Sequence, residues 1–294
     1  MVSTIPDYAE LHCITNYSFL RSASHPEELV LQAAALGYRA LAITDECSMA
    51  GVVKAHVIAK ECGLTLIIGS EFFLDEDIHL VLLAQNRIAY GQICNLITIA
   101  RRRANKGEYQ LSLTDLEFSQ AQCLALWIPG DNPSTTHGQN LKALFGDRLW
   151  ISLEIFPDGK ALRRYENAID LSKRLDVPLV ASGDVHMHQQ QRKALLDVLS
   201  AVRMKQSVRL AGRLLSSNRE KYLRPRSVLK TFYPPELLAN TVHIAERCQF
   251  SLDELRYEYP KEVVPPHLTP AAYLRQLVQA GAKQRWPEGT PSNI

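Results

Sequence analysis

Short runs of apolar and β-branched residues alternate along this chain with stretches in which apolar positions recur every three or four residues. The short runs are typical of buried strands, and the longer period is typical of helices that pack on one face. The predicted strands are 39–44, 65–68, 78–84, 123–128, 149–153 and 178–181, and the predicted helices are 26–36, 48–62, 90–103, 138–145, 160–175 and 192–203. This alternation predicts an α/β fold around a parallel sheet, either open or closed into a barrel.

The pattern changes after about residue 205. Residues 201–230 carry a single acid, Glu220, and nine basic residues: Arg203, Lys205, Arg209, Arg213, Arg219, Lys221, Arg224, Arg226 and Lys230. A predicted helix at 235–248 follows, and Pro260, Pro265, Pro266 and Pro270 then predict a stiff linker. The loop-like composition of the last residues suggests a truncated chain.

Composition narrows the class of protein. Of the 294 residues, 46% are hydrophobic and 22% are charged, values typical of a globular chain and not of a disordered one. No apolar run reaches the roughly 18 residues that cross a bilayer, and the first residues do not resemble a secretion signal. The net charge of +2 does not by itself indicate a polyanionic partner. Six cysteines without a CxxC pair predict buried thiols in a reducing cytoplasm.

Several potential metal ligands follow predicted strands. In β/α folds such positions meet at one edge of the sheet, so we expect these side chains to converge. The set is His12, Asp45, Glu46, Glu71, Glu154, Asp184 and His186, and His79 joins it although it lies at the start of its strand. Mixed imidazole and carboxylate ligands suit Zn²⁺, Mn²⁺ or Fe²⁺ and the hydrolysis of a phosphoester.

Each candidate also has a structural interpretation. Asp45 is well placed to cap the helix predicted from Ser48, and a single histidine at a strand end is more often structural than metal-binding. Residues 184–188 give the strongest local signal. In an extended segment, Asp184, His186 and His188 would point to one side.

Ordered motifs then suggest a family. HCITNYS from His12, AITDECSMAG from Ala42, IIGSE from Ile67, HLVLLAQN from His79 and GDVHMH from Gly183 resemble the successive motifs of a PHP (polymerase and histidinol phosphatase) domain. SHPEEL from Ser24 and LANTVHIAERC from Leu238 more narrowly resemble the N-terminal PHP domain of error-prone, DnaE-type C-family bacterial DNA polymerases.

The resemblance implies a distorted (β/α)7-like PHP barrel over residues 5–260, and a linker with the truncated, partly helical start of the polymerase core over 261–294. It implies a cytoplasmic parent enzyme that makes DNA with Mg²⁺ in damage-tolerant replication and repair. Its partners would be DNA, the rest of its own chain, the sliding clamp and accessory proteins, with no membrane. The polymerase carboxylates would lie beyond Ile294, and the fragment alone would be inactive.

Two departures from the family pattern predict a vestigial site. The family's His-x-His motif has Ile14 in place of its second histidine, and Glu46 replaces the histidine of Thr-Asp-His-Gly. We therefore expect no resident Zn²⁺ or Mn²⁺, the remaining weak candidates being His12, Glu71, His79, Asp184 and His186. Clustered acids would then raise one another's pKa or recruit protonated histidines.

Two alternatives stay open at this point. One is a free-standing, metal-dependent PHP phosphoesterase of the histidinol-phosphatase type. The other concerns the basic run, where Arg203, Lys205, Arg209 and Arg213 are candidates for contact with DNA phosphates. The same residues would equally suit a solvated surface, or one that packs on an acidic part of the polymerase.

Overall fold

The structure is a computed structural model that describes residues 5–117, 122–131, 133–256, 263–289 and 291. It divides into two units, Met1–Leu255 and Arg256–Ile294. The strands of the first unit form one seven-stranded sheet in chain order: β1 (Ala9–Glu10), β2 (Ala40–Ile43), β3 (Thr65–Leu74), β4 (Ile78–Ala84), β5 (Cys123–Ile128), β6 (Leu149–Glu154) and β7 (Leu179–Ser182). The predicted α/β barrel is confirmed.

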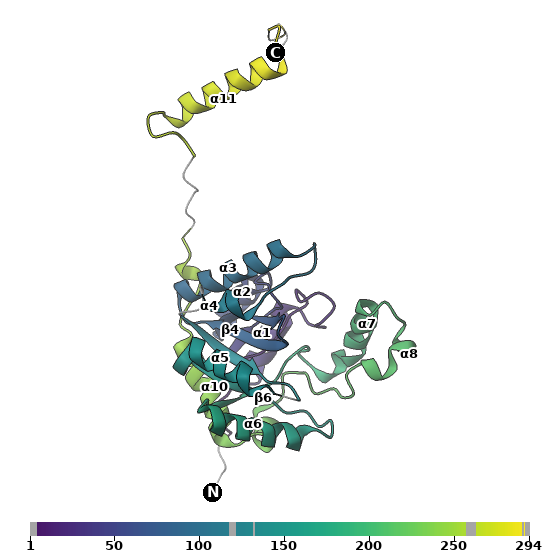
Figure 1. The fold of residues 1–294 in the computed structure, drawn as a ribbon. Helices are drawn as coiled ribbons and strands as arrows, with labels where there is room; N and C mark the ends of the chain where they lie inside the picture. Colours follow the sequence, from purple (N-terminus) through teal and green to yellow (C-terminus); the bar gives the residue numbers. More distant parts are fainter. Residues whose placement is uncertain (1–4, 118–121, 132, 257–262, 290, 292–294) are drawn as a thin grey trace. The chain divides into compact units, whose positions relative to one another are not determined.

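Helices pack around the outside of this sheet (Figure 1). The helices of the first unit are α1 (Pro26–Ala35), α2 (Val52–Cys62), α3 (Arg87–Arg103), α4 (Leu113–Glu117), α5 (Thr135–Phe145), α6 (Ala161–Leu175), α9 (Arg226–Phe232) and α10 (Pro235–Arg247), together with α7 (Lys193–Arg203) and α8 (Val208–Ala211), which project from the barrel. The second unit contains α11 (Pro270–Arg285). No helix in the described part of the chain is long and apolar enough to cross a membrane.

The sheet is mixed, so the prediction of a wholly parallel sheet was wrong. Strands β1 to β3 run parallel, as do β5 to β7, but β4 is antiparallel to both β3 and β5. The reason is that no helix separates β3 from β4. A tight turn over 75–77, where Asp77 has a φ of 58°, joins them as a hairpin. Because β3 continues to Leu74, Glu71 lies within this strand and not after it.

Polar contacts between the ends of β1 and β7 bring the two outer strands of the sheet together. Cys13 and Val185 form a parallel bridge, in which the Val185 amide donates to the His12 carbonyl at 2.9 Å. Below the bridge, the buried Glu10 Oε1 accepts hydrogen bonds from the backbone amides of His12 at 3.0 Å and Gly183 at 2.9 Å. A Cβ at Gly183 would lie 2.3 Å from Glu10 Oε2, which explains the glycine there.

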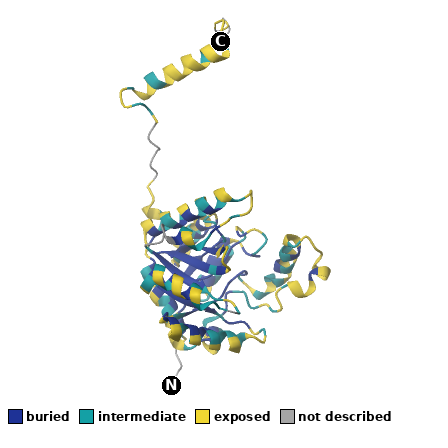
Figure 2. Cartoon of the chain, in the orientation of Figure 1, coloured by how far each residue is buried: buried dark blue, intermediate teal, exposed yellow. Residues whose placement is uncertain are grey.

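Alternation along the strands separates two apolar clusters. One face of each strand fills the barrel interior with residues such as Ile67, Val81, Leu126 and Trp150, and Ile244 of α10 joins this cluster. The opposite face packs against the outer helices in the larger cluster. Figure 2 shows that the sheet is the most buried part of the chain.

Residues 192–220, which we call the arm, include α7 and α8 and extend away from the barrel (Figure 1). Leu196 of α7 packs in a small cluster with Ala23 and Met187, which lie outside the arm. Most of the arm's residues are exposed or intermediate (Figure 2).

Several local predictions need correction. The helix predicted from Ser48 begins at Val52, and Pro270 opens α11 instead of belonging to a linker. Cys62 is exposed and Cys94 is half-buried, so only four of the six thiols are buried as predicted. Pro260 and the predicted boundary at 260–261 lie outside the described residues.

The close approach at Gly69 gives a test of the barrel packing. A Cβ there would lie 2.5 Å from the Leu82 carbonyl oxygen, so Gly69→Ala should lower the free energy of unfolding by about 1–3 kcal/mol, a usual cost of overpacking. Gly91→Ala is the matched control, because that helical position has nothing within 4 Å, and it should stabilise by about 0.5–1 kcal/mol. Urea unfolding of both variants measures the difference, and equal effects would contradict this packing.

Candidate functional site

Strand register brings three candidate side chains to one mouth of the barrel. Side chains that are an even number of residues apart lie on the same face of a strand. Glu71 on β3 therefore shares the interior face with Ile67, and Glu154 on β6 shares it with Trp150. Because β4 is antiparallel, its first residues lie beside the ends of β3 and β5, as the pairing of His79 with Phe73 and Ile128 shows. His79 therefore belongs at the same mouth, although it begins its strand.

His12 is at the centre of this mouth. Its Nε2 lies 2.8 Å from Glu71 Oε2, its Nδ1 lies 2.8 Å from Glu154 Oε1, and His79 Nε2 approaches the same Glu71 oxygen at 3.2 Å. Burial alone would lower the pKa of His12, but its hydrogen bonds with Glu154 and Glu71 raise this pKa well above the usual value. The raised pKa favours the protonated ring of His12, in which both nitrogens would donate to these carboxylates.

Arg21 lies in the same cluster, and the sequence analysis did not identify it. Its Nη1 donates to Glu46 Oε2 at 2.6 Å and also contacts Glu71 Oε1 as an ion pair, while the guanidinium lies 5.3 Å from the Phe73 ring centroid. Burial tends to raise the pKa of Glu71, yet the bonds from His12 and His79 and the charge of Arg21 hold it well below the usual range. The carboxylate therefore stays ionised although it is fully buried.

A second cluster forms around Asp184, whose φ of 42° lies in the left-handed region. His186 Nε2 lies 2.7 Å from Asp184 Oδ1, and Lys221 contacts Asp184 Oδ2 as an ion pair. Burial would raise the pKa of Asp184, but the charges of Lys221 and His186 hold it well below its usual range. Burial lowers the pKa of His186, although the Asp184 carboxylate beside it acts in the opposite direction. The prediction that protonated histidines would pair with the acids fits His12, whose pKa is raised, but not His186, whose pKa is lowered; Arg21 and Lys221 supply the permanent cations.

The two departures from the family motif have clear structural consequences. Ile14 is fully buried and its amide donates to the Val185 carbonyl at 3.0 Å, so this position contributes packing and no ligand atom. Glu46 Oε1 accepts a hydrogen bond from the Tyr109 hydroxyl at 3.1 Å, while its other oxygen pairs with Arg21.

Two of the expected roles were wrong. Asp45 does not cap a helix: its Oδ1 accepts from the Thr15 amide at 2.8 Å and the Ser18 hydroxyl at 2.7 Å, which positions the loop that carries Arg21. His188 does not join Asp184 and His186, because its Nδ1 lies 2.8 Å from Ser24 Oγ. The left-handed backbone at Asp184 breaks the regular alternation on which that prediction depended.

The basic residues also separate into two groups. Arg203, Lys205, Arg209 and Arg213 are exposed on the arm, whereas Lys221 faces the mouth and Arg224 is buried against Phe156 and Phe232. Arg101 in the last turn of α3 donates to the carbonyls of Glu46 and Cys47 at 3.2 Å.

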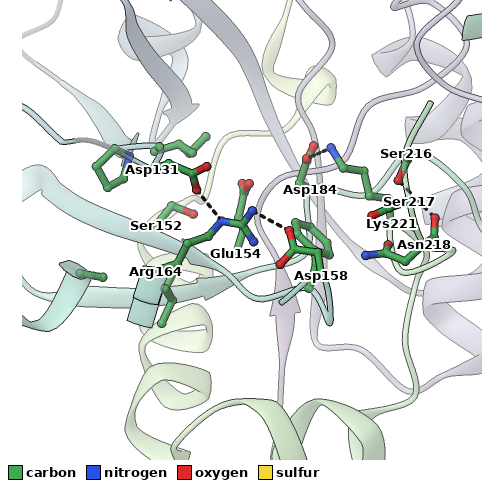
Figure 3. Close-up of a pocket in the computed structure, with 16 residues that line it drawn as sticks. Asp131, Ser152, Glu154, Asp158, Arg164, Asp184, Ser216, Ser217, Asn218 and Lys221 are labelled. Carbon is green, nitrogen blue, oxygen red and sulfur yellow. Dashed lines mark hydrogen bonds and ion pairs between the residues drawn. The ribbon is translucent and has the colours of Figure 1, made fainter. Parts of the chain in front are cut away.

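A pocket of about 570 Å³ opens beside the mouth and shares Glu154, Asp184 and Lys221 with it (Figure 3). Arg164 of α6 lies on its far side, where its Nε donates to Asp131 at 3.1 Å and its Nη2 donates to Asp158 at 2.6 Å. The pocket's cations and acids are thus largely paired with one another. The sequence analysis missed Arg164, because a basic residue on an amphipathic helix usually faces solvent.

His12, Glu71 and His79 have the composition of a metal site, with ligand atoms within 4.8 Å of one another. Two histidines and one glutamate also occur as protein ligands in catalytic zinc sites. A metal ion needs a lone pair on one nitrogen of each imidazole, and His12 directs Nε2 at Glu71 and Nδ1 at Glu154. Glu71, the carboxylate that both histidines approach, is also paired with Arg21 and so already has a cationic partner.

The barrel and its mouth define a PHP domain. The PHP domain family model matches residues 10–162, and the chain belongs to this family. It is 50% identical to the error-prone DNA polymerase of Dechloromonas aromatica (strain RCB) over 99% of this chain, and 51% identical to that of Methylococcus capsulatus over 98%. The chain spans only 29% and 28% of those two relatives. A solved amidohydrolase from Chromobacterium violaceum is 16% identical, with a TM-score of 0.47 over 61% of this chain and 88% of its own.

The ion pairs of Glu71 predict an acid-sensitive fold. Because its folded-state pKa is depressed, its contribution to stability is present above the unfolded-state pKa and is lost as the pH falls toward the folded-state value. Glu71→Gln should lower the free energy of unfolding at pH 7 by about 3 kcal/mol, since it breaks a buried pair, and should flatten the pH dependence below about pH 5. Urea unfolding in EDTA measures both effects.

The control is Glu61→Gln, which changes an exposed carboxylate on α2 and should alter stability by less than about 0.5 kcal/mol. An unchanged pH profile in the Glu71→Gln variant would contradict the assigned role of this carboxylate.

Proposed function

We propose that this chain is the N-terminal PHP module of an error-prone DNA polymerase. The observation that carries the proposal is the identity of about 50% to such polymerases over 99% of the chain. In this proposal residues 5–260 form the module, and residues 261–294 are the linker and the start of the polymerase core. The whole enzyme extends a DNA primer in the cytoplasm during damage-tolerant replication and repair.

The polymerase chemistry would belong to the rest of the enzyme. Two Mg²⁺ ions held by carboxylates beyond Ile294 would stabilise the transferring phosphoryl group. DNA, the sliding clamp and damage-tolerance accessory proteins would be the partners of that larger protein. The barrel described here would have a structural role, with a vestigial site at His12, Asp45, Glu46, Glu71, His79, Glu154, Asp184 and His186 that holds no resident Zn²⁺ or Mn²⁺.

The isolated 294-residue chain should therefore not extend a primer, even with Mg²⁺ and all four deoxynucleotides. The full-length polymerase from the same gene, assayed in parallel on a labelled primer-template, should extend it. Template-dependent extension by the isolated chain that is lost when one of its own carboxylates is replaced would overturn the proposal.

A second candidate function, a metal-dependent phosphoesterase, is favoured by the grouping of His12, Glu71 and His79. Against it stand the buried Ile14 and the pairing of Glu46 and Glu71 with Arg21. The chain should not hydrolyse p-nitrophenyl phosphate when Mn²⁺ or Zn²⁺ is supplied. Turnover that disappears in the His12→Ala variant would establish this second function instead.

The exposed arm would contribute to DNA binding through Arg203, Lys205, Arg209 and Arg213. Each phosphate contact adds about 0.9 to the slope of log affinity against log salt for duplex DNA, so Arg209→Gln with Arg213→Gln should lower that slope by about 2. Fluorescence anisotropy at several salt concentrations gives the slope, with Arg102→Gln on the exposed end of α3 as control. An unchanged slope would favour a protein contact, which the exposed Leu210 and Leu214 would also suit.

A further inference from the structure

We infer that Arg21 and Lys221 act as built-in counter-cations that keep divalent metal ions out of the PHP site. Each side chain supplies to one carboxylate cluster the positive charge that a metal ion would supply. The inference deepens the proposed structural role of the site, because it names the residues that keep the site closed.

The charges at the mouth support this role. The carboxylates of Glu46, Glu71, Glu154 and Asp184 gather at one end of the barrel, and without positive charge they would repel one another. Arg21 pairs with two of them, Glu46 and Glu71, and Lys221 pairs with Asp184. A divalent ion would have to displace these permanent cations before it gained the same carboxylates.

Arg21 is fixed in place by its loop. The preceding Leu20 has a φ of 61°, and the Arg21 amide donates to the Ser18 carbonyl at 2.9 Å. On the other side, Ser22 Oγ and the Ala23 amide both donate to the His186 carbonyl, at 2.8 and 3.0 Å. The Arg21 side chain is only 13% exposed, so the loop holds the guanidinium inside the mouth.

Lys221 is held in a similar way. Its carbonyl accepts hydrogen bonds from the amides of His186 at 3.0 Å and Met187 at 3.1 Å, which aligns it with the segment that carries Asp184. Its ammonium lies 5.6 Å from the Phe156 ring centroid, a second favourable contact for the cation. The segments that carry the two counter-cations are thus both hydrogen-bonded to the His186 backbone.

The two ion pairs differ in which ligands they affect. Arg21 pairs with Glu71, the carboxylate that both His12 and His79 approach. Replacing Arg21 therefore removes the counter-charge from the three residues that have the composition of a metal site. Restoring the family histidines alone, with Ile14→His and Glu46→His, would leave Arg21 on Glu71. This difference separates the effect of the counter-cation from the effect of the missing ligands.

The test measures Zn²⁺ and Mn²⁺ binding to the purified chain by isothermal titration calorimetry, with elemental analysis after dialysis. Arg21→Gln should raise the affinity by roughly 10–100-fold, the range over which groups bonded to metal ligands change affinity. Arg192→Gln is the matched control, because it removes an equal charge from an ion pair with Glu28 outside the mouth, and it should bind no better than the parent. The Ile14→His, Glu46→His double variant should gain most of its affinity only when Arg21→Gln is added.

Three results would overturn the inference: a tightly bound equivalent of metal in the parent chain, equal gains in Arg21→Gln and Arg192→Gln, or no gain in Arg21→Gln. Circular dichroism confirms that each variant is folded, and Lys221→Met provides an independent variant at the Asp184 cluster, where a gain is likewise expected. If neither the parent nor the folded Arg21→Gln binds metal, the counter-cation role fails while the structural role of the site survives. None of these metal-binding measurements depends on polymerase activity.

Discussion

The buried carboxylate of Glu10 is the interaction on which the geometry of the barrel mouth depends. One of its oxygens accepts from the amides of Leu11, His12 and Gly183, and the other accepts from the Tyr8 hydroxyl at 2.8 Å. Three backbone donors and a phenol would lose their partner without it, and each unsatisfied buried group costs free energy. The same contacts bring the segment after β1, with His12, beside the segment after β7, with Asp184.

In the closed barrel, the negative charges of the carboxylates at the mouth need nearby positive charges. The fold concentrates carboxylates at the ends of its strands, which in other proteins is an arrangement that suits metal ions. Here the compensating charge comes from a guanidinium and an ammonium, together with an imidazole whose pKa is raised by the carboxylates beside it. Their hydrogen bonds are directional, and they therefore fix side chains that an ion would otherwise coordinate.

The sequence predicted the barrel and most of the acidic and imidazole groups at its mouth, because strand periodicity and the position of a residue at a strand end are local properties. His12, Glu71, His79 and Glu154 do meet, as do Asp184 and His186. The cations were not predicted, since Arg21 and Lys221 lie in irregular segments whose direction depends on contacts with the His186 backbone. The antiparallel β4 was missed for a related reason: a hairpin turn of a few residues reverses a strand without changing its apolar pattern.

The ion pairs of the mouth have a consequence for the life of the protein in a cell. A barrel whose carboxylates are neutralised by metal ions reaches its full stability only when those ions are supplied, because binding free energy then forms part of folding free energy. Arg21 and Lys221 are synthesised with the chain and are present at a fixed ratio of one each. In the proposed role, such a module would fold to the same stability in metal-starved and metal-replete cells, and its assembly would not compete with enzymes that need zinc or manganese.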